Sequence, residues 1–268
     1  MKLAAVIGDP IAHSRSPVLH GHWLDRYGID GAYVPLHVRP DRLAHVLELL
    51  PDLGFSGCNV TIPHKEAALA LCDQVTDRAR RIGAANTLTF TSDGLHGDNT
   101  DGHGFLANLS AGSNWHADRP VLVLGAGGAA RGVIDALVQA GVPQIRLSNR
   151  TRARADALAD MSDRVAVCDW PPRPADLSDL GLLVNTTALG MAGHPPLDLD
   201  LGGLPPDAVV TDIVYTPLVT PLLADAASGG HRTVDGLGML LHQAAPGFER
   251  WFGVRPEVDA LLRAAVLG

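Results

Sequence analysis

The chain has 268 residues, of which 46% are hydrophobic and 19% are charged, and its formal net charge is -8 at pH 7. This length and composition are typical of globular proteins, and we expect two domains rather than one. The acidic balance and the aromatic content of 4% argue against a nucleic-acid or membrane partner, so an anionic ligand would require a local cluster of hydrogen-bond donors.

The first apolar run is followed by Asp9 and Pro10, which end it too early for a signal peptide and favour a first strand. No stretch approaches the roughly 18 apolar residues of a membrane-spanning helix. The three cysteines are widely spaced and fit neither a disulfide framework nor a zinc site, so we expect reduced thiols and a cytoplasmic location. The tightest histidine pair, His20 and His22, would point to different faces of a helix, and we expect no metal site.

The first hundred residues alternate strand-like and helix-like segments, which predicts a βαβαβ arrangement. In chain order, the expected segments are strand 3–7, helix 17–27, strand 32–38, helix 41–50 and strand 56–60. Proline is tolerated at the first position of a helix, so Pro17 and Pro63 mark expected helix starts. Hydroxyls of Ser14, Ser16 and Thr61 would cap them.

A second α/β unit is predicted from Pro120 onward. Its expected segments are strand 121–124, a glycine turn, a helix to 140, and strands 144–148, 182–184 and 209–214. The polar, glycine-rich region 93–115 is predicted to be a hinge. The closing segment 238–268 is predicted to be helical, and periodicity alone assigns it to neither domain.

The glycine turn has the sequence Gly125-Ala126-Gly127-Gly128-Ala129-Ala130 and directly follows an apolar strand. In that context it is typical of a dinucleotide-binding fingerprint, in which Gly127 lets the backbone approach a pyrophosphate at a helix N-terminus. An ordinary strand-turn-helix connection is the alternative.

The cofactor's identity depends on the residues after the second strand of this unit. An NAD-binding chain would carry a carboxylate there to accept from the ribose 2'-hydroxyl. Here the chain has Asn149-Arg150-Thr151, followed by Arg152 and Arg154. Guanidinium groups match a 2'-phosphate in charge and geometry, so the pattern favours NADPH.

Several motifs taken together resemble the shikimate dehydrogenase family. In the first half these are Ser14-Arg15-Ser16-Pro17, Gly57-Cys58-Asn59-Val60-Thr61-Ile62-Pro63-His64-Lys65, Ala85-Asn86-Thr87 and Gly97-Asp98-Asn99-Thr100-Asp101-Gly102. In the second half they are Asn149-Arg150-Thr151, Asn185-Thr186-Thr187-Ala188-Leu189-Gly190-Met191 and Asp235-Gly236-Leu237-Gly238-Met239-Leu240-Leu241-His242-Gln243. The resemblance covers essentially the whole chain.

The resemblance implies an α/β protein with an N-terminal α/β substrate domain and a Rossmann-type, doubly wound parallel-sheet cofactor domain. The substrate domain would comprise residues 1–102 and the C-terminal helices 237–268, and the NADP-binding domain residues 103–236. The active site would lie in the cleft between them. The implied reaction is the reversible, NADPH-dependent reduction of 3-dehydroshikimate to shikimate in chorismate and aromatic amino-acid biosynthesis.

Reduction of a ketone needs a proton at oxygen as well as a hydride at carbon, so an acid must stand beside the nicotinamide. By resemblance, Lys65 and Asp101 are the catalytic pair, with Lys65 as acid in reduction and as base in oxidation, and Asp101 orienting it. The sequence leaves open which of the two carries the proton.

The resemblance also implies the ligand-binding residues. Those expected to bind substrate, with the serines at its carboxylate, are Ser14, Ser16, Thr61, Lys65, Asn86, Asp101, Tyr215 and Gln243; Tyr215 is also placed toward the cofactor. Those expected to bind NADP(H) are Gly125, Ala126, Gly127, Gly128, Ala129, Asn149, Arg150, Thr151, Arg154, Thr187, Ala188, Met191, Ile213, Gly236 and Met239. Met239 is the weakest of these, since methionine at helical spacing is more often core.

Two alternatives remain at this stage. A quinate or quinate/shikimate dehydrogenase would share the Lys65 and Asp101 pair but often prefers NAD, and Arg150 is the feature that distinguishes it. A non-catalytic dinucleotide-binding sensor would keep the glycine turn without needing that pair. The expected partner is a small-molecule substrate, and the oligomeric state is open, with a homodimer as one alternative.

Overall fold

The computed structural model describes residues 1–268, and the chain divides into two units. The first comprises Met1–Asp101 and Leu240–Gly268, and the second Gly102–Met239. These bounds lie within a few residues of the expected domain limits. The functional roles of the two units, and the placement of the site in a cleft between them, stay predictions.

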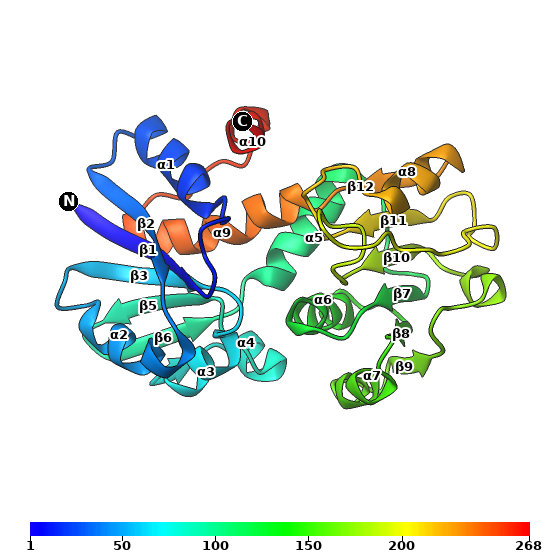
Figure 1. Ribbon diagram of the computed structural model, residues 1–268, viewed down its shortest axis with the longest axis horizontal. Helices are drawn as coiled ribbons and strands as arrows, with labels where there is room; N and C mark the ends of the chain where they lie inside the picture. The colour runs from blue at the N-terminus through cyan, green and yellow to red at the C-terminus, as the bar shows by residue number, and fades with distance from the viewer. The chain divides into compact units, whose positions relative to one another are not determined.

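The first unit contains a six-stranded mixed sheet (Figure 1). Its strands, in the spatial order β2-β1-β3-β5-β6-β4, are β2 (Gly31–His37), β1 (Lys2–Gly8), β3 (Phe55–Val60), β5 (Thr87–Thr91), β6 (Gly94–Asp98) and β4 (Gln74–Val75). β1 pairs in parallel with β2 and β3, while β5 is antiparallel to both β3 and β6. The carboxyl ends of β1, β3 and β6 and the start of β5 therefore meet at one edge of the sheet.

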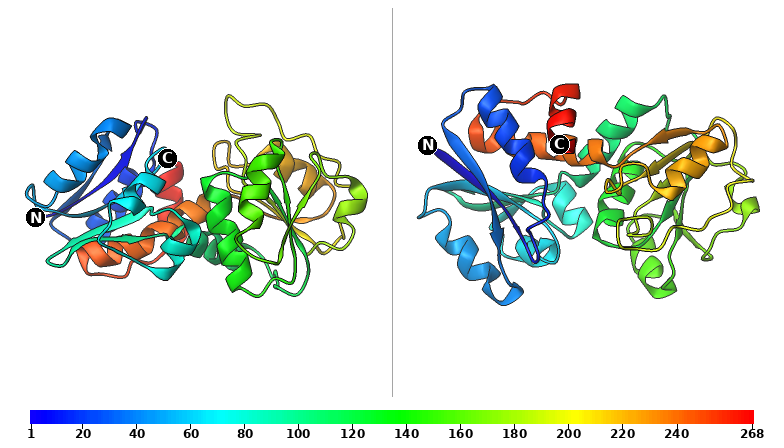
Figure 2. Two further views of the ribbon diagram at one scale, coloured as in Figure 1. Left: turned by 90° about the horizontal axis from the view of Figure 1, so that it is seen from below. Right: turned by 45° about the horizontal axis from the view of Figure 1, so that its top comes forward.

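Helices cover both faces of this sheet (Figures 1 and 2). On one face α2 (Leu43–Leu49) and α3 (Lys65–Ala70) pack on apolar residues of β1 and β3, including Ala5, Ile7 and Val60. On the other face lie α1 (Ser16–Arg26), α9 (Leu237–Phe252) and α10 (Ala260–Leu267). The remaining helical segments are η1 (Pro40–Arg42) and α4 (Asp77–Ile82). The closing segment is helical, as expected.

An aromatic cluster joins α1, β2 and α9, and His20 lies at its centre with no exposed surface. Its ring stacks on Tyr33 with centroids 3.8 Å apart, and Trp23, Phe248 and Trp251 surround it. Neither ring nitrogen has a hydrogen-bond partner. Burial therefore lowers the pKa of His20 from 6.5 to about 3, because the charged form cannot be solvated there.

Because the pKa of His20 is lowered on folding, we expect the free energy of unfolding to depend on pH. The variant His20→Phe should lose this dependence. Between pH 6.5 and about 3 the unfolded state binds the proton more readily, so stability falls as the pH falls. At about pH 5.5 the loss is roughly 1.4 kcal/mol relative to neutral pH. Urea unfolding of both proteins at about pH 7.5 and pH 5.5 should show this difference. Identical losses in wild type and variant would contradict it.

The second unit contains a six-stranded, fully parallel sheet (Figure 1). Its strands, in the order β12-β11-β10-β7-β8-β9, are β12 (Arg232–Val234), β11 (Val209–Asp212), β10 (Leu182–Asn185), β7 (Val121–Leu124), β8 (Ile145–Ser148) and β9 (Val165–Cys168). The chain leaves β7 toward β8 and later enters the other half of the sheet at β10. The switch point lies between β7 and β10, which is where doubly wound sheets bind ligands.

Helices also cover both faces of the second sheet. One face carries α5 (Asp101–Gly112), α6 (Gly128–Gln139) and α7 (Arg152–Ala159), and the other carries η2 (Pro174–Leu177) and α8 (Pro221–Ser228). The central strands β7, β10 and β11 are buried throughout, as expected of a parallel sheet covered on two sides. The predicted α/β class with a Rossmann-type second half is confirmed. No helix of the chain is long and apolar enough to cross a membrane.

Region 93–115, expected to be a hinge, contains strand β6, all of helix α5 and the boundary between the two units at Asp101 and Gly102; its role as a hinge stays a prediction. Its glycines allow close packing, since a Cβ at Gly97 would lie 2.5 Å from the Cys72 sulfur and one at Gly102 would lie 2.7 Å from the Gly132 carbonyl oxygen. The predicted cap by Thr61 is wrong, and the predicted helix start at Pro63 lies two residues too early, because α3 begins at Lys65 after His64.

Candidate active site

The predicted substrate residues of the first unit gather where β1, β3 and β6 end and β5 begins. Thr61 follows β3, Asn86 precedes β5, and Asp101 follows the turn after β6. Lys65 opens α3 beyond the loop that starts at Thr61. Sheet topology, rather than closeness in sequence, brings these side chains to one edge.

Lys65 and Asp101 form an ion pair, with Nζ donating to Oδ2 at 2.5 Å. Asp101 is buried and Lys65 half-buried, so solvent screens the pair less than a surface salt bridge. The other carboxylate oxygen of Asp101 accepts from Nδ2 of Asn86 at 2.7 Å. Asp101 is thus an acceptor on both oxygens, which suits a carboxylate that orients a neighbouring ammonium group.

The orientation of the Asn86 amide is fixed by its surroundings. Its Oδ1 accepts from the backbone N–H of Thr100 at 2.9 Å, and a backbone N–H can only donate. Its Nδ2 consequently faces Asp101 and, at 3.3 Å, Oε1 of Gln243. Gln243 lies on α9. Its backbone carbonyl oxygen also accepts a hydrogen bond from Oγ1 of Thr100 at 2.8 Å. Four predicted residues therefore belong to one hydrogen-bonded network.

The remaining predicted residues of the first unit follow the carboxyl ends of β1 and β3 in the chain and form no hydrogen bond with the four members of this network: Ser14, Ser16 and Thr61. Ser14 accepts from the backbone N–H of Ser16 through its hydroxyl at 3.3 Å, but the N-cap of α1 is Arg15 and makes no side-chain hydrogen bond, so the predicted serine cap is wrong. The Ser16 side chain makes no capping bond to the helix. A Cβ at Gly8 would lie 2.6 Å from the Thr61 methyl group, so a glycine is required there for Thr61 to pack against the end of β1.

The structure adds residues that sequence reasoning missed. Asn59 accepts from the Tyr33 hydroxyl at 2.7 Å and donates to the Asn86 carbonyl at 3.2 Å. Tyr33 also interacts with Ser16. Asn59 lies within a motif quoted for the family, which was a usable signal, whereas nothing local distinguishes Tyr33 from an ordinary strand residue.

In the second unit, the glycine turn has the geometry that a dinucleotide site needs. Gly125 has φ of +103°, and a Cβ there would lie 2.8 Å from the Thr186 hydroxyl. Cβ atoms at Gly127 and Gly128 would meet nothing within 4 Å, so the space beside them is open. The N-cap of α6 makes no side-chain hydrogen bond, which leaves backbone N–H groups available to an anion.

Next to this turn, the arginine cluster separates into paired and unpaired members. Arg152 forms ion pairs with Asp156 and Asp169, both at 3.4 Å. Arg150 and Arg154 form none, and both are exposed. Asn149 ties the cluster to the glycine turn by accepting from the Ala126 N–H at 3.2 Å. The loop carries no carboxylate between β8 and α7, so these residues fit a 2'-phosphate.

A buried network joins the ends of β10 and β11. Asn185 donates to Asp212 at 3.0 Å, and Asp212 also accepts from Thr220 at 2.7 Å and the Val214 N–H at 3.0 Å. Burial raises the pKa of Asp212 above its ordinary value, although these hydrogen bonds oppose the shift. Asn185 in turn accepts from Thr187, so the network holds together the two loops that carry predicted cofactor residues.

The other predicted cofactor residues lie on these loops or beside them. Ala188 and Met191 are exposed on the loop after β10, and Tyr215 follows β11. A Cβ at Gly236 would lie 2.3 Å from the Ile213 carbonyl oxygen. Glycine at position 236 therefore allows the backbone there to approach Ile213. Met239 is buried in the core of the second unit; its contact with the cofactor stays a prediction.

Family models match most of the chain. Residues 6–88 match the shikimate dehydrogenase substrate binding domain, residues 107–187 match shikimate / quinate 5-dehydrogenase, and residues 236–266 match the shikimate 5'-dehydrogenase C-terminal domain. The first and third matches fall mainly in the first unit and the second falls in the second unit.

Individual proteins match over nearly their whole length. A shikimate dehydrogenase (NADP(+)) from Cereibacter sphaeroides is 62% identical, covering 99% of this chain and 96% of that protein. A shikimate 5-dehydrogenase from Thermus thermophilus, solved with NADP(H) and shikimate, is 38% identical with a TM-score of 0.88. The match covers 99% of this chain and 98% of that one. A quinate dehydrogenase from Corynebacterium glutamicum, solved with NAD, is 32% identical with a TM-score of 0.92. The match covers 100% of this chain and 99% of that one.

Proposed function

This chain belongs to the shikimate dehydrogenase family, and on that premise we propose that it catalyses the reversible, NADPH-dependent reduction of 3-dehydroshikimate to shikimate. The observation that carries the proposal is the ion pair between Lys65 and Asp101, 2.5 Å apart and supported by Asn86. A dinucleotide-binding sensor has no need for such a pair. The relatives' names support both the substrate and the cofactor.

Bound NADPH supplies the hydride to the carbonyl carbon. Lys65 donates the proton to the developing alkoxide, and its ammonium charge stabilises that oxygen before the transfer. Asp101 holds Nζ in place and stays an acceptor, since Asn86 donates to its second oxygen. In the oxidation direction Lys65 takes the proton from the substrate hydroxyl.

The basic residues of the chain support this role for Lys65. Of the 21 lysines and arginines, only Lys2 and Lys65 are lysines. An arginine could form the ion pair with Asp101, but its guanidinium does not release a proton at ordinary pH. A lysine at position 65, in a chain that otherwise uses arginine, is therefore consistent with a residue that must exchange a proton.

Ser14 and Ser16 bind the substrate carboxylate in this proposal, while Thr61, Asn86 and Gln243 bind its hydroxyls. Neutral donors near the start of α1 suit an anion in a chain of net charge -8. Asn149, Arg150, Thr151 and Arg154 bind the adenosine 2'-phosphate. The glycine turn binds the pyrophosphate.

Replacing Ser16 with alanine should raise the KM for shikimate roughly 10- to 100-fold, the value of one hydrogen bond to a charged group. The kcat should change little, because the carboxylate is remote from the reacting carbon. The N-cap of α1 is Arg15, so the change removes no cap from the helix. Ser228→Ala, an exposed helical serine of the second unit, is the matched control. An unchanged KM in Ser16→Ala would exclude Ser16 as a carboxylate ligand.

Location and assembly are part of the proposal. Three free thiols, Cys58, Cys72 and Cys168, are consistent with the reducing cytoplasm. Sedimentation equilibrium would distinguish a monomer from a homodimer.

Initial rates of shikimate and quinate oxidation, each with NADP+ and with NAD+, test the proposed function. We expect the shikimate and NADP+ combination to give the highest kcat/KM. A preference for quinate or NAD+ would instead assign the chain to the quinate dehydrogenases, and no turnover of either substrate would overturn catalysis altogether.

A further inference from the structure

Asp98, at the end of β6, is the most heavily hydrogen-bonded carboxylate of the first unit, and its side chain is only 1% exposed. Arg78 donates to both of its oxygens, through Nε at 2.6 Å and a terminal nitrogen at 2.5 Å. Arg250 donates at 2.5 Å and the Thr76 hydroxyl at 2.7 Å. We call Arg78, Asp98 and Arg250 the arginine clamp.

The clamp has an excess of positive charge, with two guanidinium groups on one carboxylate. Burial alone would raise the pKa of Asp98, but the hydrogen bonds from Arg78 and Thr76 and the two arginine charges outweigh it and hold the pKa well below its usual range. Asp98 is therefore ionised at every pH at which the protein would work. A buried, permanently charged group with this many donors has a fixed position.

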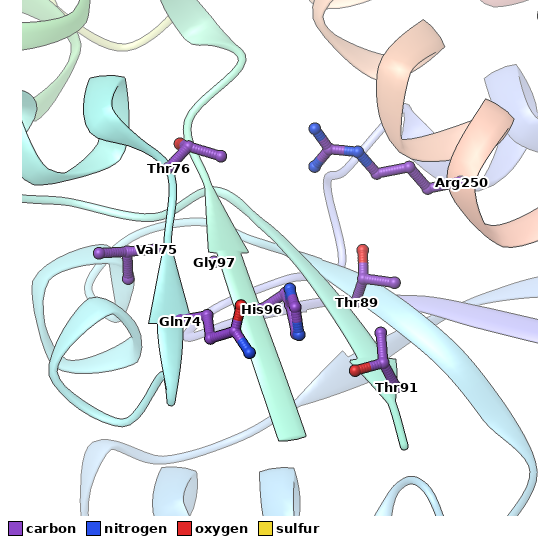
Figure 3. Close-up of a pocket in the computed structure, with 8 residues that line it drawn as sticks. All are labelled: Gln74, Val75, Thr76, Thr89, Thr91, His96, Gly97 and Arg250. Atoms are coloured by element: carbon purple, nitrogen blue, oxygen red, sulfur yellow. The ribbon is translucent and has the colours of Figure 1, made fainter. Parts of the chain in front are cut away.

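The partners of Asp98 come from separate elements. Thr76 precedes α4 and caps it by accepting from the Ala79 N–H at 3.3 Å, Arg78 lies on α4, and Arg250 lies on α9. Figure 3 shows Arg250 reaching toward the sheet from the helix side, across a pocket of about 370 Å³, with Thr76 on the opposite wall. The clamp thus ties α4 and α9 to the end of β6.

Beyond Asp98, the two residues Asn99 and Thr100 connect β6 to Asp101 at the start of α5; we call this connection the turn. The Asn99 N–H donates to Asp98 Oδ1 at 2.7 Å, and Asn99 Oδ1 accepts from the Asp101 N–H at 3.1 Å. Asn86 N–H donates to the Asp98 carbonyl at 2.9 Å. The position of the Asp101 backbone is therefore set through a continuous chain of hydrogen bonds that begins at Asp98.

Helix α9 contacts this turn at two places. The Gln243 carbonyl accepts from Thr100, and Arg250 donates to Asp98. The two helical residues are seven positions apart, which is about two turns, so both face the same side. The turn is held between α9 and α4 rather than by its own residues alone.

We propose that Asp98 is a positioning residue for catalysis: clamped by Arg78 and Arg250, it fixes the turn that places Asp101 against Lys65 and Asn86. The proposal rests on the proposed dehydrogenase function. Asp98 acts through Asp101, and its partners are the arginines and the backbone. A shift of about 1 Å at a reacting centre can cost on the order of 100-fold in rate, so a loosened turn should lower kcat.

Asp98→Asn tests this proposal because it keeps the shape of the side chain and removes the charge. We expect kcat per shikimate-binding site to fall roughly 10- to 100-fold. The number of sites per chain, counted by calorimetric titration with shikimate alone, should stay near one. NADP+ binding to the second unit should be unchanged. Asp179→Asn is the matched control, since Asp179 is likewise held by two bonds from one arginine, Arg146, in the second unit.

The outcomes separate positioning from stability. If Asp98 only stabilises the fold, the number of sites falls and kcat per site stays at the wild-type value, which overturns the proposal. Wild-type protein without shikimate turnover would instead overturn the proposed function.

If Asp98→Asn fails to fold, Arg250→Met is the second test, because it leaves the hydrogen bonds from Arg78 to Asp98 in place. It should lower kcat per site roughly 3- to 10-fold, and Arg250→Lys should recover most of that loss. Wild-type rates in Arg250→Met would then overturn the inference.

Discussion

Replacing Lys65 with alanine should lower kcat for shikimate oxidation by roughly 10²- to 10⁴-fold, the usual contribution of a positioned acid or base. The reason is that, in the oxidation direction of the proposed mechanism, Lys65 takes the proton from the substrate hydroxyl and lies against the reacting oxygen. Shikimate binding should weaken much less, because the serines, Thr61 and Gln243 remain. Single-turnover rates and shikimate affinity, measured together, check the expectation.

A Lys65→Arg variant separates proton transfer from charge. Arginine preserves a positive group beside Asp101 but does not release a proton, so its kcat should fall nearly as far as that of the alanine variant. Substantial activity in Lys65→Arg would show that charge alone suffices. Lys2→Ala is the control: Lys2 is the only other lysine and donates to the Phe252 carbonyl at the far end of β1.

The features predictable from sequence are those encoded locally. The glycine turn between β7 and α6 combines an apolar strand, closely spaced glycines and a helical period, and each of these depends on neighbouring residues. The motifs that contain Lys65 and Asp101 are likewise short. Their meeting at one sheet edge was not predictable in this way, because it depends on β5, which pairs antiparallel with both β3 and β6, and the alternating pattern predicted neither β5 nor β6.

Features that depend on distant partners were not predictable. Asp98 was part of a quoted motif, yet Arg250, its partner from α9, is 152 positions away, and an aspartate with no known partner reads as a surface charge. Asp212 and Asn185 pair across two strands in the same way. The close packing of two glycines in region 93–115 also depends on distant partners, since Gly97 lies against Cys72 and Gly102 lies against Gly132.

The separation of the arginine cluster could not be read from the sequence either, and it has a direct consequence for cofactor preference. Arg150, Arg152 and Arg154 are equivalent as residue types. In the structure only Arg152 is paired with carboxylates, so its charge is already balanced. The unpaired Arg150 and Arg154 are the ones available to a phosphate.

Replacing Arg150 with methionine should therefore lower kcat/KM for NADP+ by roughly 10- to 100-fold, because a hydrogen bond to a charged group contributes about 1.5–3 kcal/mol. The value for NAD+ should change by less than about 3-fold, since NAD+ has no 2'-phosphate. Adenosine 2',5'-bisphosphate binding, which requires no catalysis, should weaken by the same factor as NADP+ binding.

Arg152→Met is the matched variant for this prediction, since it removes the same charge two positions along the chain. Because Arg152 is paired with Asp156 and Asp169, its loss should reduce NADP+ affinity by less than about 3-fold. Equal losses in the two variants would mean that only the overall charge of the loop matters. A parallel loss with NAD+ in Arg150→Met would place Arg150 at a part of the cofactor that both dinucleotides share, and the 2'-phosphate assignment would then be wrong.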